Sequence, residues 1–271
     1  MMRACALAAL VLMIAAPAFA QEAPLPRTDI AALRKEARAD VAIREALADP
    51  SRTLESRLRD KGRYVELILR AAAVKPGDRV LDIASGGGYL ALLVATLVGG
   101  PAGDRGHVDI HNTPGWIAQF PSMEVERQQA IIKKPNIGWV TLPWNDLDAP
   151  AGSYDVIVLG QVYHDVVLEG GDYEALDRRM FAMLKPGGRV VVEDHDANEF
   201  LTLREQAEQH RISHGDATGE FLKAGFALKE MMLIDSEFDD RKFNVFWPTV
   251  RGRTDRFIAV FEKPLDGKPL R

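Results

Sequence analysis

The sequence is poor in cysteine: its 271 residues include a single one, Cys5. Beyond residue 5 the chain therefore has no disulfide, no thiol nucleophile and no thiolate metal ligand. An excess of positive charge is also lacking, because 34 Lys and Arg residues stand against 39 Asp and Glu residues. The resulting net charge of −5 argues against a general nucleic-acid coat, which needs clustered positive charge.

Long apolar runs are absent after residue 20, so we expect no membrane span there. The first 20 residues have the pattern of a secretory signal peptide. Arg3 supplies a positive charge, residues 7–16 are apolar, and the sequence Ala18-Phe19-Ala20 is a small-x-small cleavage site. We expect cleavage after Ala20 and a periplasmic or secreted protein. An uncleaved anchor or a wrongly assigned start codon is the alternative.

The remaining chain divides into a leader with an N-terminal helix, residues 21–53, and one domain, residues 54–271. Apolar periodicity predicts the N-terminal helix over residues 29–48. In the domain we expect strands at 79–83, 107–110, 137–142, 154–159, 189–194, 226–233 and 256–262. The helices are expected at 54–73, 89–98, 115–129, 173–184, 200–212 and 218–224. This alternation predicts an α/β, Rossmann-like, mostly parallel seven-stranded sheet with helices on both faces.

A glycine turn, Ala84-Ser85-Gly86-Gly87-Gly88, joins the first strand to the helix that begins at Tyr89. Such glycines let the backbone approach a ligand beyond the carboxyl ends of the strands. The spacing Gly86-x-Gly88-x-x-Ala91 satisfies the dinucleotide fingerprint, so an NAD-dependent oxidoreductase is one interpretation. Asp82, inside the strand and four residues before Gly86, favours a different cofactor from NAD.

The segment 80–89 resembles the first motif of class I S-adenosylmethionine-dependent methyltransferases, D/E-x-G-x-G-x-G. Ala84 stands where the first glycine is common in that family. The segments 152–157 and 184–190 resemble the family's fourth-strand motif and fifth-strand entry. The last two strands fit its closing antiparallel pair. The resemblance covers about residues 74–263 and implies a sheet with an antiparallel last strand.

A narrower resemblance is to a bacterial group of predicted exported methyltransferases, for which no substrate is settled. Its marks in this sequence are Gly86-Gly87-Gly88-Tyr89, Tyr163-His164-Asp165, Asp194-His195, His210-Arg211-Ile212 and Thr254-Asp255-Arg256-Phe257.

The resemblance implies S-adenosylmethionine as the cofactor, with the acid under its methionine end. The cofactor-binding residues that it implies are Asp82, Ala84, Gly86, Gly87, Gly88, Tyr89, Asn112, Asp146 and Gln161. The family's second strand usually ends in an acid that holds the ribose hydroxyls. Asn112 is nearest that position and is favoured over Asp109, although its amide accepts only through its oxygen. Asp146 is the candidate for the adenine amino group, with an exposed loop acid as the alternative.

Methyl transfer requires alignment of donor and acceptor and, for some acceptors, removal of a proton. The loop after the fourth strand would face the methyl group. His164 is the favoured general base there because an unperturbed imidazole has a pKa of about 6.5. Tyr163 and Asp165 lie beside it, and Asp165 would orient the ring; capping of the next turn is the alternative. His195, with Asp194, ends the fifth strand on the same side of the sheet.

Two metal sites are conceivable. His107, Asp109 and His111 alternate along one strand, and His210 and His214 are four residues apart on an expected helix. We expect no required metal, because the first group fits an exposed strand wall equally well. Between the last two strands, the aromatic segment 236–249 would cover an acceptor site, and His210 with Arg211 would close its pocket.

The sequence thus predicts an exported S-adenosylmethionine-dependent methyltransferase that acts on a small-molecule acceptor, without a nucleic-acid partner. One alternative is an exported binding protein that keeps the cofactor fold without turnover, since the donor is made in the cytoplasm. The NAD-dependent oxidoreductase is the other. The acceptor and the oligomeric state are left open.

Overall fold

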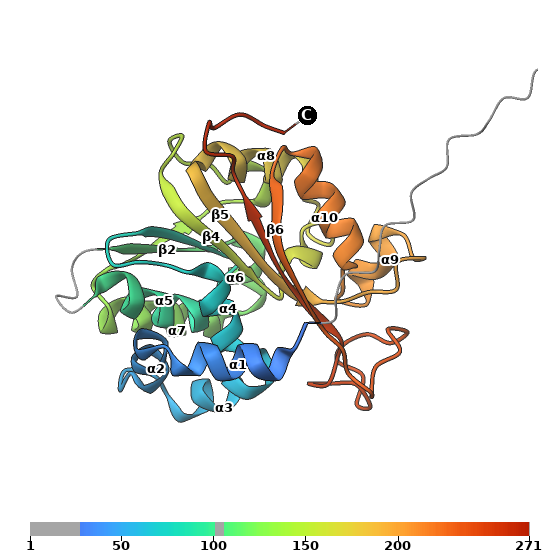
Figure 1. The fold of residues 1–271 in the computed structure, drawn as a ribbon, viewed down its shortest axis with the longest axis horizontal. Coiled ribbons are helices and arrows are strands. Elements are labelled where there is room, and N and C mark those ends of the chain that lie inside the picture. Colours follow the sequence, from blue (N-terminus) through green and yellow to red (C-terminus); the bar gives the residue numbers. More distant parts are fainter. Residues whose placement is uncertain (1–27, 101–105, 271) are drawn as a thin grey trace, which may run out of the picture.

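The computed structural model describes residues 28–100 and 106–270, so the expected signal peptide, residues 1–20, lies outside the described residues. A seven-stranded sheet runs through the molecule with helices on both faces (Figure 1). The strands are β1 (Arg79–Ile83), β2 (His107–Asn112), β3 (Ile137–Thr141), β4 (Tyr154–Gly160), β5 (Leu184–His195), β6 (Ala227–Ile234) and β7 (Arg256–Glu262). Their order is β3-β2-β1-β4-β5-β7-β6, and β7 runs in the direction opposite to the other six described strands. The predicted fold class is confirmed.

Several expected helices are divided in two by a single residue. The helices are α1 (Ile30–Ala39), α2 (Val41–Ala48), α3 (Leu54–Arg63), α4 (Val65–Ala72), α5 (Tyr89–Gly99), α6 (Pro114–Gln119), α7 (Pro121–Lys133), α8 (Tyr173–Met183), α9 (Leu203–Glu208) and α10 (His214–Lys223). Asp40 separates α1 from α2 because its side chain accepts the Ile43 N–H and starts a new helix. Tyr64, with φ +49°, separates α3 from α4. Pro121 begins α7 because it cannot continue the hydrogen bonding of α6.

Each face of the sheet has its own hydrophobic core, because side chains alternate along every strand. On one face Val80, Val158 and Val191 pack with the buried residues of α4 and α5. On the other face Leu81, Ile157 and Val192 pack with α8 and with the aromatic residues around α10. Asp82 shares the face of Val80, so its carboxylate lies on the side of α3, α4 and α5.

The strand order reverses between β1 and β4, where the chain turns to β2 on one side and to β5 on the other. In open α/β sheets this reversal leaves a crevice at the carboxyl ends of the two strands. The glycine turn after β1 and residues 160–162 at the end of β4 meet there.

The segment after β5 departs from the sequence prediction. The expected helix 200–212 is shortened to α9, because His210 takes φ +55° and Ile212 forms a parallel bridge with Asp196. His210 and His214 therefore do not share a helical face, and the helix on which that conceivable metal pair depended is absent over residues 209–213. A long insert, residues 235–255, joins β6 to β7 and lies beyond the end of β6 and the start of β7 (Figure 1). Within the described residues, every helix is too short or too polar to cross a bilayer.

Candidate functional site

A cavity of about 410 Å³ opens where the strand order reverses. Its walls come from the glycine turn, from α3, from α6 and α7, and from residues 160–162 at the end of β4. Five of the residues predicted to bind the cofactor line it, namely Ala84, Gly86, Gly87, Tyr89 and Gln161. These five predicted residues therefore lie around one cavity at the sheet edge.

The turn reaches this shape through three residues with left-handed backbones: Ala84 (φ +49°), Gly86 (φ +60°) and Gly88 (φ +86°). Positive φ strains a residue with a Cβ, which explains why glycine suits position 84. Here His111 supports the strained peptide, because its Nδ1 accepts the Ala84 N–H at 3.4 Å and its Nε2 donates to the carbonyl of Leu142 at 2.8 Å. Burial lowers the pKa of His111 to about 4, so the ring is neutral. His111 holds the turn and is not a free metal ligand.

Asn112 lies at the end of β2, as predicted, but its amide is occupied. Its Oδ1 accepts the Gly86 N–H and its Nδ2 donates to the Gly86 carbonyl, both at 2.9 Å. The side chain is buried and fixes the peptide of Gly86. The structure thus corrects the expected ribose contact, because the Asn112 amide is bonded to the backbone of Gly86 and fixes the conformation of the glycine turn.

Asp82 is buried beneath the turn and accepts a hydrogen bond from the Ser85 hydroxyl. Burial raises the pKa of Asp82 to about 7, although the Ser85 hydroxyl, the Ala91 N–H and the charge of Arg63 all act to lower it. The carboxylate is therefore near its point of ionisation at neutral pH. A cation placed over the turn would favour the ionised form.

Gly87 faces a carboxylate that the sequence analysis missed. A Cβ at this position would lie 2.1 Å from Oε2 of Glu126, on α7, and 2.8 Å from its Cβ. Glycine is therefore required here by space, since neither α7 nor the turn can move away cheaply. Glu126 also lines the cavity, so an acid lies on its wall beside the glycine turn.

Two other predicted cofactor residues differ in placement. Gln161 lines the cavity with φ +59°, and its side chain donates to Glu193 at 3.2 Å. Asp146 is exposed in the short turn 144–146 and is not among the residues that line the cavity. Asp146 is thus an exposed loop acid, which was the alternative to the predicted contact with the adenine amino group.

The residues after β4 divide between the core and the sheet edge. Tyr163 is fully buried between Tyr173 and Phe221, and its hydroxyl donates to Asp177 at 2.8 Å. The structure therefore places Tyr163 in the hydrophobic core and away from the catalytic position predicted for it.

His164 is held between two carboxylates. Its Nδ1 lies 2.7 Å from Asp194 and its Nε2 lies 3.2 Å from Asp165. Burial alone would lower the pKa of His164, but the charges and hydrogen bonds of Asp194 and Asp165 outweigh it and raise the pKa to about 10. A ring that keeps its proton at neutral pH cannot accept another. The predicted role of neutral general base does not fit His164, whereas the predicted contact with Asp165 is present.

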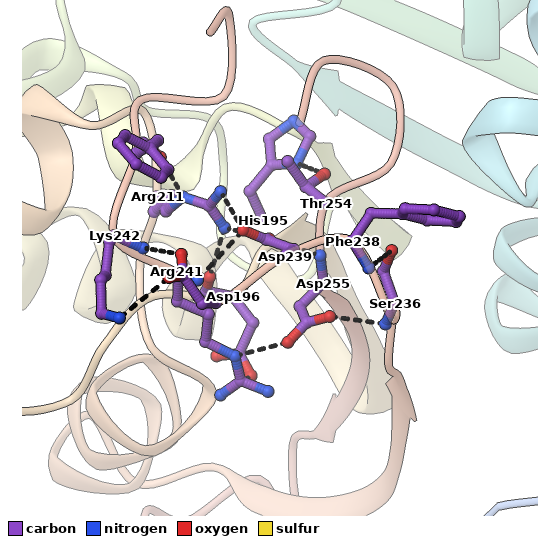
Figure 2. Close-up of polar contacts among 12 residues, drawn as sticks. His195, Asp196, Arg211, Ser236, Phe238, Asp239, Arg241, Lys242, Thr254 and Asp255 are labelled. Atoms are coloured by element: carbon purple, nitrogen blue, oxygen red, sulfur yellow. Dashed lines mark hydrogen bonds and ion pairs between the residues drawn. The ribbon is translucent and has the colours of Figure 1, made fainter. Parts of the chain in front are cut away.

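His195 has the opposite electrostatics. Burial lowers its pKa well below the usual value, and the charges of Arg256, His164, Arg211 and Arg63 lower it further. Its Nδ1 lies 2.7 Å from the Thr254 hydroxyl. The tautomer that donates from Nδ1 to Thr254 leaves the lone pair of Nε2 free. The ring is directed away from the ion pairs of Asp196 and Asp255 (Figure 2).

Comparisons with known proteins agree with this arrangement. Residues 54–232 match the sequence family described as methyltransferase domain. The chain belongs to this family. Its fold is also that of a SAM-dependent methyltransferase from Aquifex aeolicus, with a TM-score of 0.54, 15% identity and coverage of 87% of this chain and 99% of the other. Membership of the class I S-adenosylmethionine-dependent methyltransferases is thus confirmed, and S-adenosylmethionine is the cofactor of the family.

Curated relatives of this methyltransferase chain share only part of their length with it. The ubiquinone/menaquinone biosynthesis C-methyltransferase UbiE of Vibrio campbellii is 32% identical over 124 residues, 45% of this chain and 42% of the relative. The 2-phytyl-1,4-naphtoquinone methyltransferase of Nostoc sp. is 28% identical over 145 residues, 52% of this chain and 58% of the relative. The chain therefore spans 42–58% of the length of these relatives.

In this methyltransferase the insert 235–255 is fastened to the sheet edge by buried ion pairs (Figure 2). Arg211 is fully buried and bonds both carboxylate oxygens of Asp239, at 2.8 and 3.0 Å. It also donates to the carbonyls of Asp196 and Phe243. Arg241 bridges Asp196 and Asp255 at 2.8 and 2.7 Å. The insert then contributes Thr254 to His195, so it completes the edge of the site.

Sequence reasoning missed several cavity residues because they lie outside any motif. Arg63, Trp116 and Met123 come from α3, α6 and α7, and only tertiary packing brings them to the glycine turn. The sequence carried one weak sign of the role of Arg63, namely the basic residues in the last turn of α3. Thr254 had one as well, because it lies within the tail motif quoted above.

Proposed function

We propose that this protein transfers the methyl group of S-adenosylmethionine to a small-molecule acceptor. The observation that carries the proposal is the cavity at the strand reversal, whose floor is the glycine turn above Asp82. S-adenosylmethionine supplies an activated methyl group when it is bound. Gly86 and Gly87 line the cavity that would hold it, and Asp82 offers a buried carboxylate beneath its cationic methionine end.

The acceptor would lie at the carboxyl edge of β4 and β5, beside the cavity. His195 is neutral there and would accept a proton from the acceptor through Nε2. The insert presents the exposed rings of Phe243, Phe246 and Trp247 near this edge, and Phe246 packs against His210 at 5.0 Å. These rings suit an aromatic acceptor. The printed names of the relatives, which refer to quinones, support the same class.

We further propose that residues 1–20 direct export and that residues 54–271 form the methyltransferase domain after a leader at 21–53. The pattern of Arg3, the apolar stretch and Ala18-Phe19-Ala20 supports export. Mass spectrometry of the protein recovered from the periplasm or medium should find a chain that begins at Gln21. A cell-associated chain that retains Met1 would contradict this proposal.

A second candidate function is that of a binding protein that keeps the cofactor fold without turnover. Two observations favour it: Ala84 replaces the common glycine, and the Asn112 amide is occupied by Gly86. Such a protein would bind S-adenosylmethionine without ever forming S-adenosylhomocysteine. Product formation therefore separates the two functions, whereas binding alone does not.

Replacement Gly87→Ala tests the assignment of the cavity. The added methyl would meet Glu126, so we expect the affinity for S-adenosylmethionine to fall at least about tenfold, which corresponds to about 1.4 kcal/mol. The matched control is Gly219→Ala in α10, where a Cβ meets no atom within 4 Å. Calorimetric titration of wild type and both variants measures the affinities.

The same titration with NAD decides between the two cofactors that the glycine spacing allows. We expect S-adenosylmethionine and S-adenosylhomocysteine to bind and NAD not to bind. Binding of NAD alone would favour the oxidoreductase. Equal affinity of wild type and Gly87→Ala for S-adenosylmethionine would show that the cofactor does not bind in this cavity.

A further inference from the structure

His164, Asp165 and His210 bring three metal-ligating atoms together at the carboxyl edge of the sheet. His164 and Asp165 come from the turn after β4, whereas His210 comes from the loop between α9 and α10. One ligand atom from each lies within 4.8 Å of the other two. This group differs from both pairings that the sequence suggested, because only the fold places His210 beside residues 164 and 165.

Two of the three separations match those of a tetrahedral site, and in the third one nitrogen of each imidazole lies within 4.8 Å of the other. Asp165 Oδ1 lies 3.2 Å from His164 Nε2 and 3.4 Å from His210 Nδ1. Zinc binds histidine nitrogen at about 2.0–2.1 Å and carboxylate oxygen at about 2.0–2.2 Å. At a tetrahedral angle these bond lengths put two ligand atoms about 3.4 Å apart. The three side chains therefore need little movement to hold one ion.

The surroundings are also those of a metal site. Asp194 lies 2.7 Å from Nδ1 of His164, and Nε2 of the same ring faces Asp165, where a bound ion would displace the Nε2 proton. A carboxylate behind a ligating histidine fixes its tautomer and orientation. The two acids, Asp165 and Asp194, would balance the charge of one divalent ion. The His210 side chain is 34% exposed, so an ion has a route from solvent.

We propose that His164, Asp165 and His210 bind one divalent transition-metal ion, with zinc as the best match to two imidazoles and a carboxylate. Three protein ligands leave a fourth position open for water or an acceptor oxygen, as in catalytic zinc sites. This position lies at the edge where the proposed acceptor would sit, next to the ring of Phe246. Metal binding itself does not depend on the proposed methyl transfer.

Titration of the purified, EDTA-treated protein with Zn²⁺ alone tests the site. We expect one equivalent to bind. In His210→Asn the affinity should fall at least tenfold, because the variant loses an imidazole while asparagine tolerates the left-handed backbone at this position. Asp194→Asn should weaken binding about 10–100-fold, as expected for a carboxylate behind a ligand.

His107→Ala is the matched control. His107 is also partly exposed and lies 3.0 Å from a carboxylate, Asp109, but has no second imidazole beside it. This variant should bind Zn²⁺ like wild type. Circular dichroism shows whether each variant is folded. Absence of zinc binding by wild type, or equal affinity of folded His210→Asn and wild type, would overturn the site. Neither result bears on the titration with S-adenosylmethionine. The metal site and the proposed methyl transfer can therefore be refuted independently.

Discussion

Replacement His195→Gln is expected to lower the turnover number about 100-fold while leaving the affinity for S-adenosylmethionine within about twofold of wild type. General-base catalysis contributes about 10²–10⁴-fold. We expect the lower end of this range, because a base whose pKa is held well below the usual value gains little from accepting a proton. Glutamine keeps a similar size and can donate a hydrogen bond from its amide to the Thr254 hydroxyl, as Nδ1 of His195 does, but it cannot take up a proton.

The measurement is the rate of S-adenosylhomocysteine formation with 1,4-naphthoquinol as the acceptor, together with the dissociation constant of the donor. His107→Gln is the control, since this histidine lies on β2, at the opposite end of that strand from the site. A loss confined to turnover supports proton transfer by His195. Equal losses of turnover and donor affinity would show instead that His195 supports the cavity wall. Unchanged turnover would remove it from the mechanism.

Replacement Arg211→Ala is expected to lower the free energy of unfolding by about 3–5 kcal/mol. Arg211 is fully buried, and its removal leaves the carboxylate of Asp239 without the guanidinium that bonds both its oxygens. The carbonyls of Asp196 and Phe243 lose donors as well. Breaking a buried pair by removing one partner is costly because the remaining charge stays out of water. For a domain of this size the loss corresponds to a fall in Tm of about 10 °C.

Thermal unfolding followed by circular dichroism measures this change. Arg178→Ala is the matched control, because Arg178 pairs with Glu174 across one turn of α8 and both side chains are exposed. Its Tm should change by no more than about 2 °C. A similarly small change in Arg211→Ala would show that the insert is held by other contacts. Limited proteolysis within residues 235–255 should also accelerate in Arg211→Ala alone.

The fold was predictable because its signals are local and repeated. The apolar strand from Arg79 to Ile83, the glycines after it and the helix from Tyr89 indicate one unit of the sheet. The KPGG turn before the fifth strand indicates another. Helix ends were less predictable, since Asp40 and Tyr64 break their helices through a side-chain cap and a left-handed backbone that apolar periodicity does not reveal.

The site was predictable only where a motif carried it. The glycine turn lines the cavity as expected, yet Asn112 binds Gly86, and the charge of His164 depends on Asp194, which comes from a different strand. Glu126 and Arg63 reach the cavity through packing of α7 and α3, so their positions in the sequence carry no sign of this role. The pKa of His164 is raised and that of His195 is lowered, and both shifts depend on charged neighbours that are distant along the chain.

A crystal structure of the protein grown with S-adenosylhomocysteine tests the central claim most directly. We predict that the ligand lies in the cavity between α3 and the glycine turn, with its methionine end over Asp82 and its sulfur toward the edge of β4 and β5. Arg63 and Tyr89 should contact it. A ligand bound elsewhere on the molecule, or an empty cavity at a ligand concentration far above the dissociation constant, would contradict the account.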